Sequence, residues 1–190
     1  MELIQRLLKE GSVKQILLHC CCAVCSCSII ERLLDDGVIL FFYNPNIHPE
    51  NEYLRRKNEL IQYAGKLNVP CIDAEYEDSL WFDRMRGLEA EPERGARCTE
   101  CLRMRLYKAA ECAALRRIRT IATTLGISRW KDLQQVNEAG RWAVSHFEAV
   151  QFLNSNWRKN GGIQRMAEIS REEEFYRQTY CGCLFSNKNK

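Results

Sequence analysis

The sequence predicts an α/β fold in which helices flank a mostly parallel β-sheet. Two observations favour it: short apolar runs of strand type alternate with segments of helical periodicity, and their spacing leaves room for a helix between strands. A chain of 190 residues, 46% of them hydrophobic, suits one domain with its own core. Parallel sheets place their sites beyond the carboxyl ends of the strands, so we expect the site there.

The first half of the chain contains most of the predicted sheet. Strands are expected at residues 14–20, 38–46 and 69–76, and helices at 28–37 and 50–68. Gly37 is a typical helix terminator, and the Asn44–Pro45 pair indicates a turn after the second strand. The carboxyl ends of these strands bring the first cysteines and Tyr43 toward one edge of the sheet.

The second half continues the alternation and then weakens. Helices are expected at residues 99–117 and 131–147, with a fourth strand at 119–126 between them. After Gln151 the patterns fade. We therefore expect one α/β domain over residues 1–190, in which residues 151–190 form a C-terminal extension that wraps the sheet.

Composition indicates a cytoplasmic protein without a membrane segment. Residues 1–14, "MELIQRLLKEGSVK", are charged and amphipathic, unlike a signal peptide, and no run of about 18 apolar residues occurs. Reducing pools keep cytoplasmic thiols free, so the 11 cysteines favour a metal or redox site over structural disulfides. Residues 19–28 contain no glycine, which argues against a phosphate loop and hence against a bound nucleotide.

Three groups of cysteines stand out: Cys21, Cys22 and Cys25 after the first strand, Cys98 and Cys101 at the start of a helix, and Cys181 and Cys183 near the C-terminus. A C-x-x-C that opens a helix places two thiols one turn apart, near the positive helix end that favours thiolates. Together with an adjacent pair it offers four thiolates, a number that suits tetrahedral zinc or an iron–sulfur cluster. The isolated Cys71 and Cys112 are expected to pack as small apolar residues.

The C-terminal Cys-Gly-Cys is a different device. Gly182 permits a tight bend between Cys181 and Cys183. A disulfide that closes so small a ring is strained and easily reduced, which favours a redox pair. The alternative is a further pair of metal ligands.

Four segments, "HCCCAVC", "YNPNIHPENEYLRR", "RCTECLRMRL" and "YCGC", together resemble the epoxyqueuosine reductases of the QueH type, over residues 14–186. That family reduces epoxyqueuosine to queuosine at the tRNA wobble position, the last step of queuosine biosynthesis, without cobalamin. The resemblance implies a Rossmann-like fold similar to the HUP, or adenine nucleotide hydrolase-like, class. Val24 stands where the family usually has a proline.

The resemblance also implies a cofactor and a site. It implies a 4Fe-4S cluster held by Cys21, Cys22, Cys98 and Cys101 at the strand ends, and a redox-active pair at Cys181 and Cys183. Reducing an epoxide to an alkene requires two electrons and the loss of oxygen as water, so a redox cofactor is expected. Surplus thiols such as Cys25 could hold an additional iron ion. The electron donor is not identifiable from the sequence.

A tRNA substrate requires cations for its phosphates and aromatic residues for its bases. The predicted substrate-binding residues are Tyr43, Asn46, Tyr53, Arg56 and Arg103. Arg55, Lys57 and Arg105 are further candidates for phosphate contacts, Trp130 and Trp157 for stacking, and His19, His48, Tyr43 and Asp73 for the proton donor. A zinc-stabilised RNA-binding module and a thiol–disulfide oxidoreductase remain alternative functions.

Overall fold

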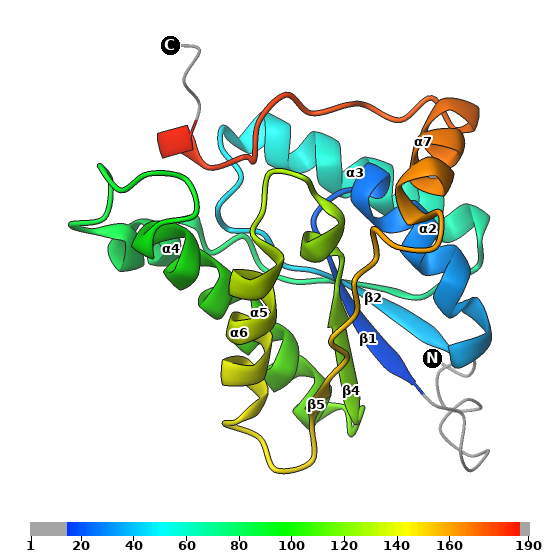
Figure 1. Cartoon of the computed structure of the whole chain (residues 1–190), viewed down its shortest axis with the longest axis horizontal. Coiled ribbons are helices and arrows are strands. Elements are labelled where there is room, and N and C mark those ends of the chain that lie inside the picture. Colours follow the sequence, from blue (N-terminus) through cyan, green and yellow to red (C-terminus); the bar gives the residue numbers. More distant parts are fainter. Residues whose placement is uncertain (1–14, 187–190) are drawn as a thin grey trace.

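In the part of the chain that the structure describes, five parallel strands form the centre, with helices on both faces (Figure 1). The structure, a computed structural model, describes residues 15–186. The amphipathic segment predicted within residues 1–14 and the last residues of the predicted extension, 187–190, lie outside this range. Among the described helices, none is long and apolar enough to span a membrane.

The sheet has the strand order β3-β2-β1-β4-β5. Its strands are β1 (Ile16–Cys20), β2 (Val38–Phe42), β3 (Cys71–Asp73), β4 (Thr120–Thr123) and β5 (Gln151–Phe152). Every pairing is parallel, and Leu18 of β1 lies opposite Leu40 on one side and Ala122 on the other. The predicted α/β class is thus confirmed, with a sheet that is wholly parallel in the described range.

Within residues 15–186, six helices cover the sheet in two layers. They are α2 (Ala23–Leu33), α3 (Glu50–Lys66), α4 (Asp78–Met85), α5 (Ala96–Leu115), α6 (Leu133–Val144) and α7 (Gly162–Glu172). Side chains alternate between the faces of a strand, so Leu18 packs with α2, α3 and α7, whereas its neighbour Leu17 packs with α4, α5 and α6. Short 3₁₀ turns follow α2 (η1, Leu34–Asp36) and β4 (η2, Thr124–Ile127), and a third, η3 (Leu184–Ser186), ends the described chain.

Several element boundaries differ from the predicted ones. The first helix begins at Ala23 rather than at residue 28, because Cys22 caps it directly after β1. The second strand ends at Phe42, and the third is three residues long. The elements α4, β5 and α7 were not predicted.

The strand order reverses beside β1, the geometry that creates a crevice at a topological switch point. The chains that leave β1 and β4 turn away to opposite faces of the sheet. Cys21 follows β1, and Thr124 follows β4. The backbone N–H of Cys21 donates to the Thr124 hydroxyl at 3.4 Å, so the two strand ends meet at this crevice.

The chain after α7 passes over the carboxyl ends of β1 and β2 as an extended segment, residues 173–183, which we call the C-terminal strap (Figure 1). The backbone N–H of Tyr176 donates to a Glu59 carboxylate oxygen on α3 at 2.7 Å. Arg56 of α3 donates to the carbonyls of Tyr180 and Cys181, each at 3.2 Å. These contacts fasten the strap to α3 and bring the Cys-Gly-Cys segment to the site.

Candidate metal centre and its cavity

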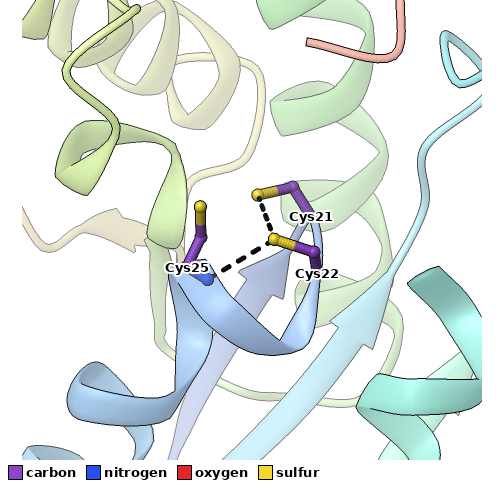
Figure 2. A group of neighbouring side chains, drawn as sticks. All are labelled: Cys21, Cys22 and Cys25. Carbon is purple, nitrogen blue, oxygen red and sulfur yellow. Dashed lines mark hydrogen bonds between the residues drawn. The ribbon is translucent and has the colours of Figure 1, made fainter. Parts of the chain in front are cut away.

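Three thiols gather where β1 gives way to α2. The sulfurs of Cys21, Cys22 and Cys25, hereafter the three-thiol group, all lie within 4.8 Å of one another. Cys22 has extended backbone angles and is the N-cap of α2, and its Sγ accepts the backbone N–H of Cys25 at 3.4 Å (Figure 2). The Sγ atoms of Cys21 and Cys22 are 3.8 Å apart. The position after β1, the N-cap and the first turn of α2 each carry one of the three cysteines, and their sulfurs therefore lie close together.

The surroundings of the three-thiol group favour one ionised sulfur. Hydrogen bonds from the thiols of Cys22 and Cys25, with the nearby charge of Arg105, hold the pKa of Cys21 well below its ordinary value despite burial. The same contacts and burial raise the pKa of Cys22 and Cys25. Clustered thiols near a helix N-terminus and a buried cation are soft ligands suited to zinc, copper(I) or an iron–sulfur cluster, so this donor set fits metal binding.

The strap supplies a polar contact to the same sulfurs. Gln178 Nε2 donates to Cys22 Sγ at 3.1 Å and lies 3.9 Å from Cys25 Sγ. Amide hydrogen bonds to sulfur ligands tune the properties of a bound cluster. The strap therefore takes part in the site as well as covering it.

The predicted C-x-x-C pair lies on a helix across from this group. Cys98, Cys101 and Arg105 are spaced by three and four residues on α5, so they share one face of the helix. Arg105 is fully buried, and its charge acts on both Cys21 and Cys181. This face of α5 is thus turned toward the other motif cysteines, although neither Cys98 nor Cys101 belongs to the three-thiol group.

The Cys-Gly-Cys segment packs beside the C-x-x-C pair, and both of its thiols are free. Cys183 is buried, and its neighbours include Cys101 and Cys181. Gly182 has φ +101°, and a Cβ there would lie 2.9 Å from Ile47 Cγ1, so the predicted need for glycine at this bend has two physical causes.

Among the described residues, Cys181 is the thiol with a direct cationic partner. Lys131 Nζ donates to Cys181 Sγ at 3.1 Å. Burial acts against ionisation of Cys181, but Lys131 and Arg105 outweigh it and lower the pKa of the thiol. Burial likewise acts against the charge of Lys131, yet the adjacent sulfur raises the pKa of the lysine. The pair therefore favours a thiolate beside an ammonium.

A cavity of about 310 Å³ joins the two regions. Cys21 and Cys25 line it from one side and Cys181 from the strap. Its cations are Arg56, Arg105, Arg129, Lys131 and Arg177. No carboxylate is among the described residues that line it, so it is suited to an anionic ligand.

The five residues predicted to bind substrate lie in different places. Arg56 lines the cavity and is fixed there by Glu52 at 2.7 Å. The Tyr43 hydroxyl donates a hydrogen bond to a Glu77 carboxylate oxygen at 2.7 Å, and Tyr43 does not line the cavity. The side chain of Asn46 is buried and has no hydrogen-bond partner among the described residues.

The other two predicted substrate-binding residues also lie outside the cavity lining. Tyr53 is buried and stacks on Tyr76, with ring centroids 3.9 Å apart. Arg103 pairs with Glu100 at 2.9 Å on the partly exposed side of α5.

The candidate proton donors are held in other contacts. His19 is buried in β1 between Thr123 Oγ1 at 3.0 Å and the Tyr43 carbonyl at 3.1 Å, and burial, with the charge of Arg105, lowers its pKa to about 3. It is therefore a neutral packing residue. His48 lies against Tyr76, and Asp73 pairs with Lys57 at the surface.

The structure also brings residues to the site that the sequence patterns did not indicate. Thr124, Lys131 and Gln178 contact motif cysteines, yet none belongs to a cysteine motif. Only their place in the sequence could have identified them. Thr124 and Lys131 follow the fourth strand, whose carboxyl end faces the site. For Gln178 the only indication in the sequence was that it lies three residues before Cys181.

Comparison with known proteins points to one family. The family model "Epoxyqueuosine reductase QueH" matches residues 16–189. Proteins of that name from Acinetobacter baylyi and Haemophilus influenzae are each 51% identical to the chain, over 174 and 181 residues, and these alignments cover 90% and 94% of the chain. The same alignments cover 80% and 74% of the two relatives.

A more distant relative matches over a similar span. The protein of the same name from Thermotoga maritima is 32% identical over 174 residues, which cover 90% of this chain and 89% of the relative. The thiol-lined cavity at the switch point thus occurs in a chain whose residues 16–189 match one family of reductases. The chain belongs to the epoxyqueuosine reductase QueH family.

Proposed function

We propose that this chain reduces epoxyqueuosine to queuosine at the wobble position of tRNA, in a reaction that uses a 4Fe-4S cluster and no cobalamin. The observation that carries the proposal is the three-thiol group, of which Cys21 and Cys25 line a cavity with five cations. Soft sulfur ligands suit redox metal chemistry, and the cations suit a polyanionic substrate. Family membership supplies the reaction.

The proposed cluster ligands are Cys21, Cys22, Cys98 and Cys101. The spacing of the C-x-x-C pair and Arg105 on α5 supports this set, because that face shares its buried surroundings with Cys21. Cys25 is then the proposed ligand of an additional iron ion. When bound, a 4Fe-4S cluster supplies electrons one at a time at low potential.

The redox balance gives Cys181 and Cys183 their proposed role. Conversion of the epoxide to an alkene consumes two electrons and two protons and releases the oxygen as water. Oxidation of the two thiols to a disulfide releases two electrons and two protons, so the two half-reactions balance. An external reductant, whose identity is open, then returns the disulfide to thiols.

The substrate is proposed to enter the cavity with its phosphates near the cations. Arg56 and Arg177 are the proposed phosphate contacts of the lining, and Arg103 a contact outside it. Tyr43, Asn46 and Tyr53, which lie outside the lining, are proposed to support from behind the residues that contact the substrate. A tRNA substrate and the need for reduced thiols both favour the cytoplasm as the place of action.

The test is product formation by anaerobically reconstituted protein with epoxyqueuosine-containing tRNA, measured as queuosine in digested tRNA. The Cys21→Ser, Cys22→Ser, Cys98→Ser and Cys101→Ser variants should lose most of their iron and all of the product. Cys25→Ser should retain the cluster and lose only the additional iron, which Mössbauer spectra of iron-labelled protein resolve.

Cys112→Ser is the matched control, because this thiol packs on α5 among apolar side chains. It should retain both iron and activity. Zinc in place of iron in the purified protein, with tRNA binding but no product, would favour the RNA-binding module. Disulfide exchange without epoxide reduction would favour the thiol–disulfide oxidoreductase.

A further inference from the structure

Trp130 differs from the other tryptophans of the chain in its exposure. It is 57% exposed, whereas Trp81 and Trp157 are buried and Trp142 is partly buried against Tyr107. The Trp157 indole N–H donates to the Thr123 carbonyl at 2.9 Å, so that ring is part of the core. An indole left in water contributes little to folding and is a typical contact for a ligand.

The backbone beneath Trp130 is held in place by two arginines. Arg94 donates to the carbonyls of Arg129 and Trp130 at 3.3 and 3.2 Å. Arg158 donates to the carbonyls of Ser128 and Lys131 at 2.5 and 2.9 Å. Four successive carbonyls, from residue 128 to residue 131, are therefore fixed, and the exposed indole stands on a preorganised loop.

This loop forms the rim of the cavity that holds the thiols. Trp130 lines the cavity together with Cys21 and Cys25, and the guanidinium of Arg129 lies 4.7 Å from the centroid of its ring. The lining combines this aromatic surface with five cations and no carboxylate among its described residues. A flat aromatic surface beside phosphate-binding cations matches single-stranded RNA, whose bases stack while its phosphates pair.

We propose that Trp130 stacks on a base that flanks the wobble nucleotide and so holds the anticodon loop over the cavity. Because the reacting base must reach the thiols inside, the exposed ring at the rim meets a neighbouring base. Trp130 is thus a positioning residue for the reduction. The inference rests on the proposed function, whose substrate it locates.

The test compares Trp130→Ala with Trp130→Phe on the metal-loaded protein. Affinity for an epoxyqueuosine-containing tRNA and for the same tRNA with an unmodified wobble guanine is measured at several salt concentrations. Trp130→Ala should bind both roughly 5- to 100-fold more weakly, the effect of losing one aromatic–base stack, and should raise KM more than it lowers kcat. Trp130→Phe should restore most of the affinity.

The salt dependence separates stacking from charge. Trp130→Ala should leave the slope of log affinity against log salt unchanged, whereas Arg177→Ala should reduce it by roughly 0.7 to 0.9. Leu115→Ala, which alters an apolar side chain that is 77% exposed and lies outside the cavity lining, is the control and should bind like the wild type.

Unchanged affinity and KM in Trp130→Ala, with an active wild type, would overturn the inference while leaving the reductase function intact. An equal loss in Trp130→Phe, or a reduced salt slope in Trp130→Ala, would also overturn it. If the wild type binds the tRNA but forms no queuosine, the proposed function fails, and the binding series still decides whether Trp130 stacks on RNA.

Discussion

Hydrogen bonds and buried cations lower the pKa of two of the eleven cysteines, Cys21 and Cys181. Lys131 contacts Cys181 directly, and Arg105 acts on both Cys21 and Cys181. Burial disfavours the charged form of most of the other thiols and raises their pKa values, as it does for Cys20 and Cys27. These contacts, rather than the number of cysteines, therefore favour a thiolate at these two positions, Cys21 and Cys181.

The first prediction concerns Lys131→Met. In the wild type the pKa of Cys181 is lowered, so its thiolate persists as the pH falls below the ordinary thiol pKa. Removing the ammonium raises that pKa, so alkylation of Cys181 by iodoacetamide should shift to higher pH and slow at neutral pH. The measurement is mass spectrometry of the Cys181 peptide across pH in metal-free protein. Lys66→Met, which removes an exposed lysine on α3, should leave the profile unchanged; the same shift there would contradict the pairing.

The second prediction concerns Gln178→Leu. Its amide donates to Cys22 Sγ at 3.1 Å, and such a bond stabilises the more reduced state of a sulfur-ligated cluster. The variant should keep its iron but lower the reduction potential of the bound cluster. A redox titration followed by electron paramagnetic resonance measures the shift, with the exposed Gln164→Leu as control. An unchanged reduction potential would mean that Gln178 shields the Cys22 sulfur from solvent without affecting the cluster.

At the scale of elements, the start of α2 builds the site. The helix begins one residue after Cys22, so Cys25 falls in its first turn and joins the other two sulfurs. The sequence indicated the strand and the thiols at its end, but not this boundary, because cysteine is not among the usual N-caps. The sequence therefore predicted Cys25 only as an extra thiol and did not predict that it lies beside Cys21 and Cys22.

The third prediction separates the capping role of Cys22 from its proposed metal role. Serine is a strong N-cap and alanine a poor one, so Cys22→Ser should keep the free energy of unfolding of the metal-free protein. Cys22→Ala should cost about 1 kcal/mol. Both variants should lose the bound iron equally. Chemical denaturation and iron analysis of the two proteins provide the test, and iron retained in Cys22→Ser would argue against Cys22 as a ligand.

The elements that were not predicted were missed for physical reasons. Strand β5 is only two residues long and exists through its pairing with β4, so no run of alternating residues marks it. Helix α7 begins at Gly162 with Gly161 as its N-cap, and this glycine pair is a loop signal in the sequence. In the fold Gly162 is required because a Cβ there would lie 1.8 Å from the Trp157 carbonyl oxygen. The regular strands and long helices, by contrast, followed from periodicity alone.

At the scale of the whole molecule, the site joins distant parts of the chain. The three-thiol group follows the first strand, whereas Gln178 and Cys181 come after α7 in the strap, more than 150 residues later. Only the completed sheet and the contacts of the strap with α3 bring these segments together. For this reason the sequence could name the cysteine groups but could not show their relative positions or the cavity between them.

The last prediction follows from that joint site. If Cys181 and Cys183 supply the two electrons, pre-reduced wild-type protein without an external reductant should form one disulfide for each queuosine produced. Cys181→Ser and Cys183→Ser should keep the iron of the cluster and bind the tRNA, because phosphate contacts come from arginine and lysine, but should not turn over.

Iron content, tRNA affinity, product nucleoside and the oxidation state of the peptide with both cysteines are measured on the same samples. Cys71→Ser is the control, since this partly buried thiol lies outside the cavity lining, and it should behave as the wild type. Normal turnover in both tail variants would remove the redox pair from the mechanism. Loss of the cluster in these variants would instead indicate that the sulfurs of Cys181 and Cys183 bind iron, so the pair would be metal ligands.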